Sequence, residues 1–219
     1  LPVTAKINLN AMSTILDEIV TNKRKEIEQY KPLSSIEQFR KKGFFWEVRN
    51  RSLKQSLLAE GSSGIIAEFK RKSPSKGWFK TKELEVEQVV RKYNDKGAAG
   101  ISVLTDDVYF GGDLDDLIQT KVISDIPVLR KDFIIDEYQI VEARAMGADV
   151  ILLIAACLSP DQVKYLASFA RKLDLEVLLE LHAEEELKHI CDETELIGIN
   201  NRNLKTFAVD IERSLAMAK

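Results

Sequence analysis

Beyond about residue 60, short apolar segments alternate with amphipathic segments along the chain. Six apolar segments have the length and composition of buried strands, at residues 65–70, 100–105, 127–133, 149–155, 176–181 and 196–201. Segments with apolar side chains at helical spacing lie between them, near residues 86–96, 114–124, 136–146, 160–173 and 183–192. Buried strands that alternate with helices predict a parallel sheet covered by helices and joined by right-handed crossovers.

The first 60 residues carry only helical patterns. Residues 12–30 have apolar side chains at helical spacing until Pro32, and Ser34 with Glu37 forms a capping-box signature for a second helix. A third amphipathic segment spans residues 45–59. We predict three parts in the chain. They are residues 1–11 as a vector-derived remnant or a disordered segment, 12–60 as a helical extension that acts as a lid or plug, and 61–219 as the α/β domain.

Polar residues recur where the predicted strands end. They are Glu68 and Lys70, Thr105 and Asp106, Lys131 and Asp132, Glu180, and finally Asn200 and Arg202. In a (β/α) barrel all these strand ends converge on one mouth, whereas in a doubly wound sheet only those beside the switch point meet. No Gly-x-Gly-x-x-Gly follows the first strand. The pattern therefore favours an α/β barrel with its active site at the mouth.

Two lysines and two glutamates in this set predict acid–base chemistry. Because strand side chains alternate between faces, Glu68 and Lys70 lie on the same face of the first strand. We expect pairing and burial to shift the pKa values of these two residues, and those of Lys131 and Glu180, toward neutrality. A partly desolvated Lys131 would donate a proton or form a Schiff base. The loop at residues 73–77 has a flexible backbone and positive charge, which suit an anionic group.

Composition narrows the class of protein. The 219 residues carry a formal net charge of -3 at pH 7, which argues against a protein that binds nucleic acid or an anionic membrane. No apolar run approaches the roughly 18 residues of a membrane span, and no basic segment followed by an apolar one marks a secretory signal. The two cysteines fit a reducing compartment, and His182 and His189 have no Cys or His partners at metal-binding spacing. We expect a cytoplasmic protein without a metal.

At these motifs the sequence resembles the indole-3-glycerol phosphate synthase family of tryptophan biosynthesis. The resemblance runs from about Met12 to Lys219. It is carried by IAEFKRKSPS at residues 66–75, SVLTD at 102–106 with FGG at 110–112, LRKDF at 129–133, LLELH at 178–182 and IGINNRNL at 197–204. The motifs follow the order of the family, and each lies at a predicted strand end. The resemblance implies a TIM (β/α)8 barrel with an N-terminal helical extension.

The resemblance also implies an activity and a set of roles. The family closes the ring of 1-(2-carboxyphenylamino)-1-deoxyribulose 5-phosphate with loss of carbon dioxide and water, and it uses no cofactor or metal. By this resemblance Lys131 is the general acid for carbon–carbon bond formation and Glu180 is the acid–base partner for dehydration. Lys70 would contact the substrate carboxylate and donate a later proton, while Glu68 would orient the lysines. The positioning and substrate-binding residues it implies are Asn200, Arg202, Ser73, Phe133 and Leu204.

The family has eight strand–helix units, whereas six can be counted in this sequence. We expect the chain to be truncated after about six units, with the strands that hold most of the phosphate site beyond residue 219. Two alternatives stay open: an inactive truncated barrel fragment, and another phosphate-sugar barrel enzyme such as a Schiff-base aldolase. As partners we expect a small sugar phosphate and neither nucleic acid nor membrane. A monomer is expected, and a partner enzyme of the tryptophan pathway is not excluded.

Overall fold

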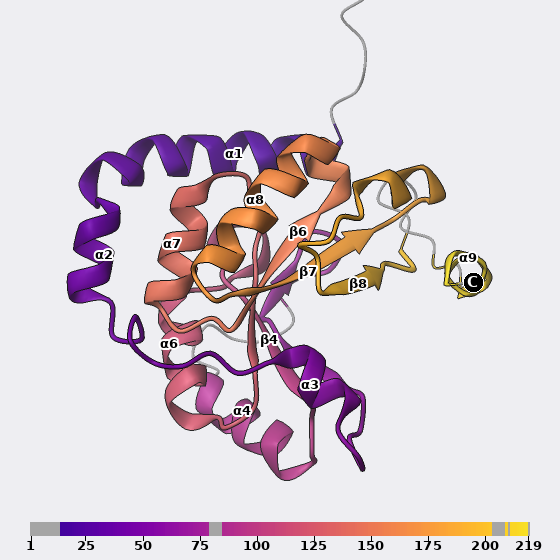
Figure 1. The fold of residues 1–219 in the computed structure, drawn as a ribbon, viewed down its shortest axis with the longest axis horizontal. Coiled ribbons are helices and arrows are strands. Elements are labelled where there is room, and N and C mark those ends of the chain that lie inside the picture. The colour runs from indigo at the N-terminus through magenta and orange to yellow at the C-terminus, as the bar shows by residue number, and fades with distance from the viewer. Residues whose placement is uncertain (1–13, 79–84, 203–208, 210, 219) are drawn as a thin grey trace, which may run out of the picture.

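The computed structural model of this chain describes residues 14–78, 85–202, 209 and 211–218. At its centre is a parallel six-stranded sheet in the order β1-β4-β5-β6-β7-β8 (Figure 1). The strands are β1 Ile66–Phe69, β4 Gly100–Leu104, β5 Val128–Lys131, β6 Val150–Ile154, β7 Glu176–Leu181 and β8 Leu196–Ile199. Neighbouring strands follow one another in sequence with parallel pairing, which is the arrangement of a (β/α) barrel. The predicted barrel architecture is therefore confirmed for six strands.

Helices cover the outer face of the sheet. They are α4 Val86–Asp95, α6 Leu114–Ile123, α7 Glu137–Ala145 and α8 Pro160–Lys172, with α5 Asp107–Phe110 and the 3-10 helices η2 Ala155–Cys157 and η3 Glu184–His189 in the connections. Outward strand residues such as Val103, Ile151 and Val177 are fully buried against them. The predicted helix at residues 183–192 is only the short 3-10 helix η3, and its N-cap residue Ala183 makes no side-chain capping bond.

The opposite face of the sheet encloses a second apolar cluster. Leu129 of β5 and Val150, Leu152 and Ile154 of β6 pack there with Leu53. Because strand side chains alternate, the positions that continue these rows toward the carboxyl ends also face inward. This alternation brings the polar strand-end residues to one end of the barrel interior.

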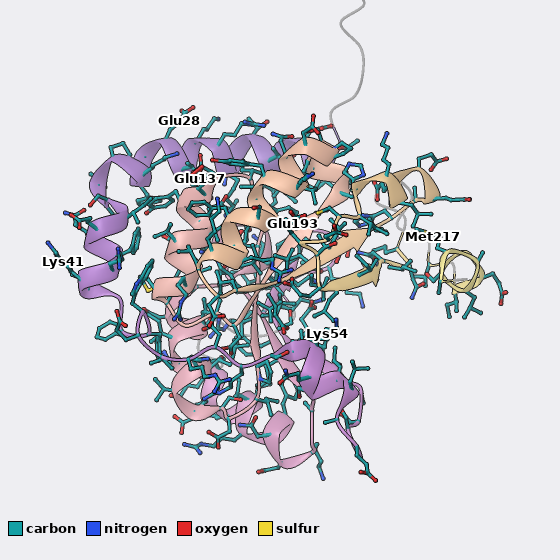
Figure 2. All side chains as sticks on the ribbon, viewed as in Figure 1. Glu28, Lys41, Lys54, Glu137, Glu193 and Met217 are labelled. Carbon is teal, nitrogen blue, oxygen red and sulfur yellow. The ribbon has the colours of Figure 1, made fainter. Side chains whose placement is uncertain are left out.

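The N-terminal helices close both ends of this interior. α1 Ile15–Tyr30 and α3 Leu53–Leu58 lie at opposite ends of the strands (Figure 1), as the positions of Glu28 and Lys54 also show (Figure 2). Leu53 is 1% exposed and packs against Gly100, where an added Cβ would lie 2.5 Å from Leu53 Cδ1. The Leu53 backbone N–H also donates to Glu176 Oε2 at 2.8 Å. The two helices thus lie at the two ends of the barrel interior, while the role of this region as a lid or plug stays a prediction.

Two details of this region differ from the sequence prediction. The capping box of α2 Ile36–Lys42 is formed by Ser35 and Gln38, one residue later than expected. The predicted helix at 45–59 is helical only in α3, because the Arg144 guanidinium binds the carbonyl oxygens of the preceding segment, including Phe45 O at 2.9 Å. These carbonyls are thereby satisfied without helical hydrogen bonds. The last described helix is α9 Ile211–Met217, and no helix in the described ranges is long and apolar enough to cross a membrane.

Candidate active site

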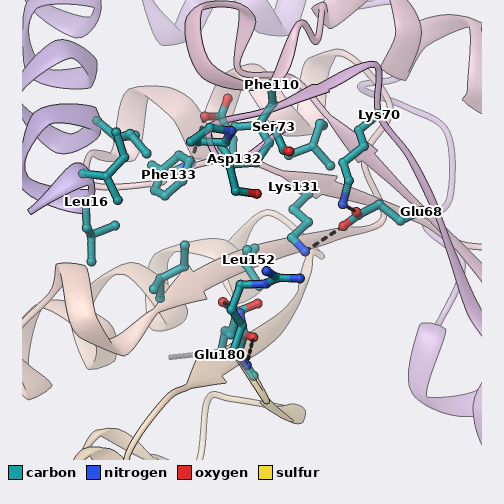
Figure 3. Close-up of a pocket in the computed structure, with 18 of the residues that line it drawn as sticks. Leu16, Glu68, Lys70, Ser73, Phe110, Lys131, Asp132, Phe133, Leu152 and Glu180 are labelled. Carbon is teal, nitrogen blue, oxygen red and sulfur yellow. Dashed lines mark hydrogen bonds and ion pairs between the residues drawn. The ribbon is translucent and has the colours of Figure 1, made fainter. Parts of the chain in front are cut away.

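A pocket of about 540 Å³ lies at the carboxyl ends of the strands (Figure 3). Eight residues predicted from the sequence to form the site line it: Glu68, Lys70, Ser73, Lys131, Phe133, Glu180, Asn200 and Arg202. The remaining one, Leu204, lies outside the described residues. The fold therefore brings the strand-end residues together as expected, while their chemical roles stay predictions.

Glu68 lies between two lysines on the charged side of the pocket. Its Oε2 is 2.7 Å from Lys131 Nζ, which comes from β5, and its Oε1 contacts Lys70 Nζ. Burial raises the pKa of Glu68, but the two ammonium groups lower it by a larger amount, so the pKa lies below its ordinary value. Burial lowers the pKa of Lys131, whereas Glu68 and Glu180 raise it by more. At neutral pH the pocket presents an ionised glutamate and a protonated Lys131.

Glu180 is held at the end of β7. Asn200, which follows β8, donates from Nδ2 to Glu180 Oε1 at 3.0 Å, and His182 Nε2 lies 3.2 Å from the same oxygen. Burial raises the pKa of Glu180, but His182, Lys131 and Asn200 together bring it below its ordinary value. The predicted shift toward neutrality is therefore wrong for Glu180, as it is for Glu68 and Lys131. Opposite charges stabilise the ionised forms more than burial destabilises them.

The other side of the pocket is apolar. Figure 3 shows Leu16 and Phe133 on one side of the pocket, and Glu68 and Lys70 on the other. The rings of Phe110 and Phe133 pack with centroids 5.9 Å apart. The aliphatic side chains that complete this wall are Ile15, Leu16 and Ile19 of α1, Leu104 of β4, and Leu152 and Ile154 of β6. Such a pocket suits a ligand with one flat apolar part and one anionic part.

The segment after β1, predicted as a mobile loop, forms a short hairpin beside the pocket. Its strands are β2 Lys72–Ser73 and β3 Gly77–Trp78, too short for any periodic pattern in the sequence. Lys72 Nζ donates to Val108 O at 2.5 Å. The Trp78 ring lies against Gly111, whose φ is +62° and where a Cβ would be 2.6 Å from the ring. These contacts hold the hairpin, and Ser73 with it, at the pocket edge.

A buried charge network that sequence reasoning missed lies beside the pocket. Lys23 of α1 places Nζ 3.2 Å from Asp106 Oδ2 and 3.1 Å from Asp132 Oδ1. Asp132 also pairs with Arg130 at 3.1 Å. The network fixes α1 over the strand ends, next to Lys131. The position of Lys23 on the buried face of α1 is the signal in the sequence that could have revealed it.

His189 is buried and contacts the backbone. Its side chain belongs to a residue that is 6% exposed, and its ring nitrogens lie 2.9 Å from Glu186 O and 3.0 Å from Leu158 O. In residues 14–78, 85–202, 209 and 211–218, no group of three or more His, Cys, Asp or Glu side chains could hold a metal ion.

The strand order and the charged mouth define the chain as a (β/α)-barrel protein with a charged pocket at the carboxyl ends of its strands. The family model for indole-3-glycerol phosphate synthase matches residues 16–219. Proteins of that name from Bacteroides thetaiotaomicron, a Polaromonas species and Desulfotalea psychrophila are 49%, 44% and 43% identical in sequence to this chain. The matches cover 94%, 94% and 95% of this chain and 78%, 79% and 80% of those proteins. The chain belongs to the indole-3-glycerol phosphate synthase family.

Proposed function

We propose that this chain carries out the indole-3-glycerol phosphate synthase reaction and acts as a carbon–carbon lyase. The reaction closes the ring of 1-(2-carboxyphenylamino)-1-deoxyribulose 5-phosphate and releases carbon dioxide and water. Membership of the family supports it, since relatives at 42–49% identity carry that name. The observation that carries the proposal is the ion pair of Lys131 with Glu68 at 2.7 Å, in a pocket that Glu180 and two aromatic rings also line. The reaction needs no oxidant or reductant, because ring closure with loss of carbon dioxide and water leaves the overall oxidation state unchanged, so the proposal includes no cofactor.

The two walls of the pocket match the two parts of this substrate. Its anthranilate ring would pack on Phe110 and Phe133, while Lys70 and Arg202 would meet its anionic groups. Ser73, in the docked hairpin, would border the substrate at the pocket edge. Ring closure is intramolecular, so a pocket that holds the ring carbon against the ketone carbon selects the reactive conformation and lowers the entropic part of the barrier.

Lys131 is the general acid in this proposal. The ring carbon that bears the carboxylate attacks the ketone carbon, and Lys131 Nζ delivers a proton to the ketone oxygen as that oxygen becomes a hydroxyl. Loss of carbon dioxide from the same ring carbon returns its bonding electrons to the ring. Glu68, 2.7 Å from Lys131 Nζ, keeps the ammonium charged and oriented. Proton delivery by a positioned group typically contributes about 10²–10⁴-fold.

Glu180 is the base for the dehydration that follows. It takes the proton from the carbon next to the new hydroxyl, and that hydroxyl leaves as water with a proton from Lys70. A base must be ionised before it can act, and the low pKa of Glu180 meets this condition at neutral pH. The Asn200 amide, 3.0 Å from Glu180 Oε1, would keep the carboxylate aimed at the substrate.

The aldolase alternative is less well supported by the same electrostatics. A Schiff-base lysine must be neutral when it attacks a carbonyl, and enzymes achieve this by lowering its pKa. In this pocket Glu68 and Glu180 raise the pKa of Lys131 instead. Borohydride reduction in the presence of substrate, followed by mass spectrometry, tests the point. A covalent adduct on Lys131 or Lys70 would overturn the synthase proposal.

The proposed function is tested by the fluorescence of the indole product. The parent chain, Lys131→Ala and Lys54→Ala are compared with the same substrate; Lys54 is exposed on α3, at the opposite end of the strands. We expect Lys131→Ala to lower turnover about 10²–10⁴-fold and Lys54→Ala to have no effect. Turnover by Lys131→Ala within about threefold of the parent would refute the acid role. No turnover by the parent would favour the inactive-fragment alternative.

A further inference from the structure

His182 is a buried titratable residue to which the proposed mechanism gives no role. It follows Glu180 by two residues, so both side chains lie on the same face and both line the pocket. The His182 side chain is 8% exposed, and its Nε2 lies 3.2 Å from Glu180 Oε1. A buried polar ring is unfavourable unless its nitrogens meet polar partners. Neither ring nitrogen makes a hydrogen bond within the described residues, and the carboxylate proposed to act as a base lies within reach of Nε2.

Two strands supply partners to the same oxygen of Glu180. Asn200, after β8, donates to Oε1 at 3.0 Å, and His182 reaches Oε1 from the end of β7. Two donors directed at one oxygen would restrict rotation of the carboxylate about its terminal bond. A carboxylate that is held through Oε1 would exchange protons with a ligand through Oε2.

Glu186 fixes the backbone at His182 and lies near the other ring nitrogen. The His182 backbone N–H donates to Glu186 Oε2 at 2.6 Å, and that oxygen lies 3.9 Å from the ring Nδ1. The ring therefore lies between the carboxylates of Glu180 and Glu186. It can donate to Glu180 when Nε2 carries a proton, which holds for the Nε2–H tautomer and for the imidazolium. Glu186 belongs to η3, so the contact links the pocket to the outer helical layer.

We propose that His182 is a positioning residue, whose Nε2–H donates to Glu180 Oε1 and so holds Oε2 toward the substrate during dehydration. This inference rests on the proposed function, because it assigns a role within that reaction. His182 acts through Glu180 and not through the substrate, so its loss affects kcat more than KM. A misplacement of about 1 Å at a reacting group can lower a rate about 10²-fold.

Two substitutions of His182 test this role. Methionine and glutamine are both unbranched and of similar length, but only the glutamine amide can donate to Glu180. We expect His182→Met to lower kcat about 10–10²-fold with KM within about threefold, and His182→Gln to stay within about threefold of the parent. A role in packing alone predicts equal losses for both substitutions, and that result would overturn the proposal. So would full activity of His182→Met.

A second measurement does not depend on turnover. The Glu180 carboxyl is titrated by ¹³C NMR in glutamate-labelled protein, with Glu180→Gln for assignment. Loss of the donor should raise the pKa of Glu180 in His182→Met, while His182→Gln should keep it close to that of the parent. An unchanged pKa in His182→Met would overturn the contact. If the parent shows no turnover, the proposed function fails, and the titration still decides whether His182 holds the carboxylate.

Discussion

Replacement of Lys23 by methionine would remove the cation from a buried cluster of acids. Lys23 Nζ lies 3.2 Å from Asp106 Oδ2 and 3.1 Å from Asp132 Oδ1. The Lys23 side chain is 6% exposed, and those of the two aspartates are 0% and 2% exposed. Methionine keeps an unbranched apolar stem that can fill the same channel. The substitution therefore removes the charge with little change in packing.

The expected loss of stability follows from what remains around each aspartate. Removal of one partner of a buried ion pair typically destabilises by about 3–5 kcal/mol, because the other charge stays buried. Asp132 keeps Arg130 at 3.1 Å, while Asp106 keeps the hydrogen bond from the Tyr109 backbone N–H at 2.8 Å. We therefore expect the lower end, about 3 kcal/mol. At about 2–4 °C per kcal/mol for a chain of this size, Tm should fall by about 6–12 °C.

The pH of the measurement follows from the pKa shifts. Burial opposes ionisation of both groups, yet pairing lowers the pKa of Asp132 and raises that of Lys23. The stabilisation is complete between the unfolded values of about 3.9 for aspartate and about 10.4 for lysine. It is lost as the pH falls through the folded pKa of Asp132 or rises through that of Lys23. Urea unfolding followed by circular dichroism at pH 7 therefore measures the full effect.

Lys31→Met is the matched control. Lys31, just after α1, pairs with Asp136 at 2.9 Å, but its side chain is 54% exposed, and exposed pairs contribute about 0.2–1 kcal/mol. Adding Asp106→Asn to Lys23→Met removes the stranded charge, and asparagine can still cap α5. The double variant should therefore recover part of the loss. The reasoning would be refuted if Lys23→Met and Lys31→Met lost equal stability. It would also be refuted if the double variant were less stable than Lys23→Met alone.

Three further outcomes are expected. Glu68→Gln should lower the pKa of Lys131, because it removes the carboxylate 2.7 Å from Nζ; an unchanged lysine ¹³C NMR titration would contradict this. Gly111→Ala should displace the Trp78 ring and shift its fluorescence, since the added Cβ would lie 2.6 Å from it; an unaltered spectrum would count against the docked hairpin. Burial raises the pKa of Cys157 to about 12, so a thiol reagent at pH 8 should label it only after unfolding, and rapid labelling of the folded chain would show otherwise.

Local patterns in the sequence were enough to predict much of the fold. The alternation of side chains predicted that Glu68 and Lys70 share one face, because it depends only on the extended backbone, and both line the pocket. Short-range hydrogen bonding predicted the capping box of α2 to within one residue, because a cap depends only on neighbouring residues. Convergence of the strand ends at one mouth required only parallel strands joined in sequence order.

Only the tertiary structure decided how the gathered residues interact. The contact of Lys23 with Asp106, and the seat of α1 over the strand ends, join segments far apart in the chain. The direction of the pKa shifts depends on a balance between burial and attraction, and attraction changes steeply over a few ångströms. The sequence by itself determined which residues reach the barrel mouth. The distances between their charges, which set their protonation and the contact of His182 with Glu180, came from packing that no local pattern encodes.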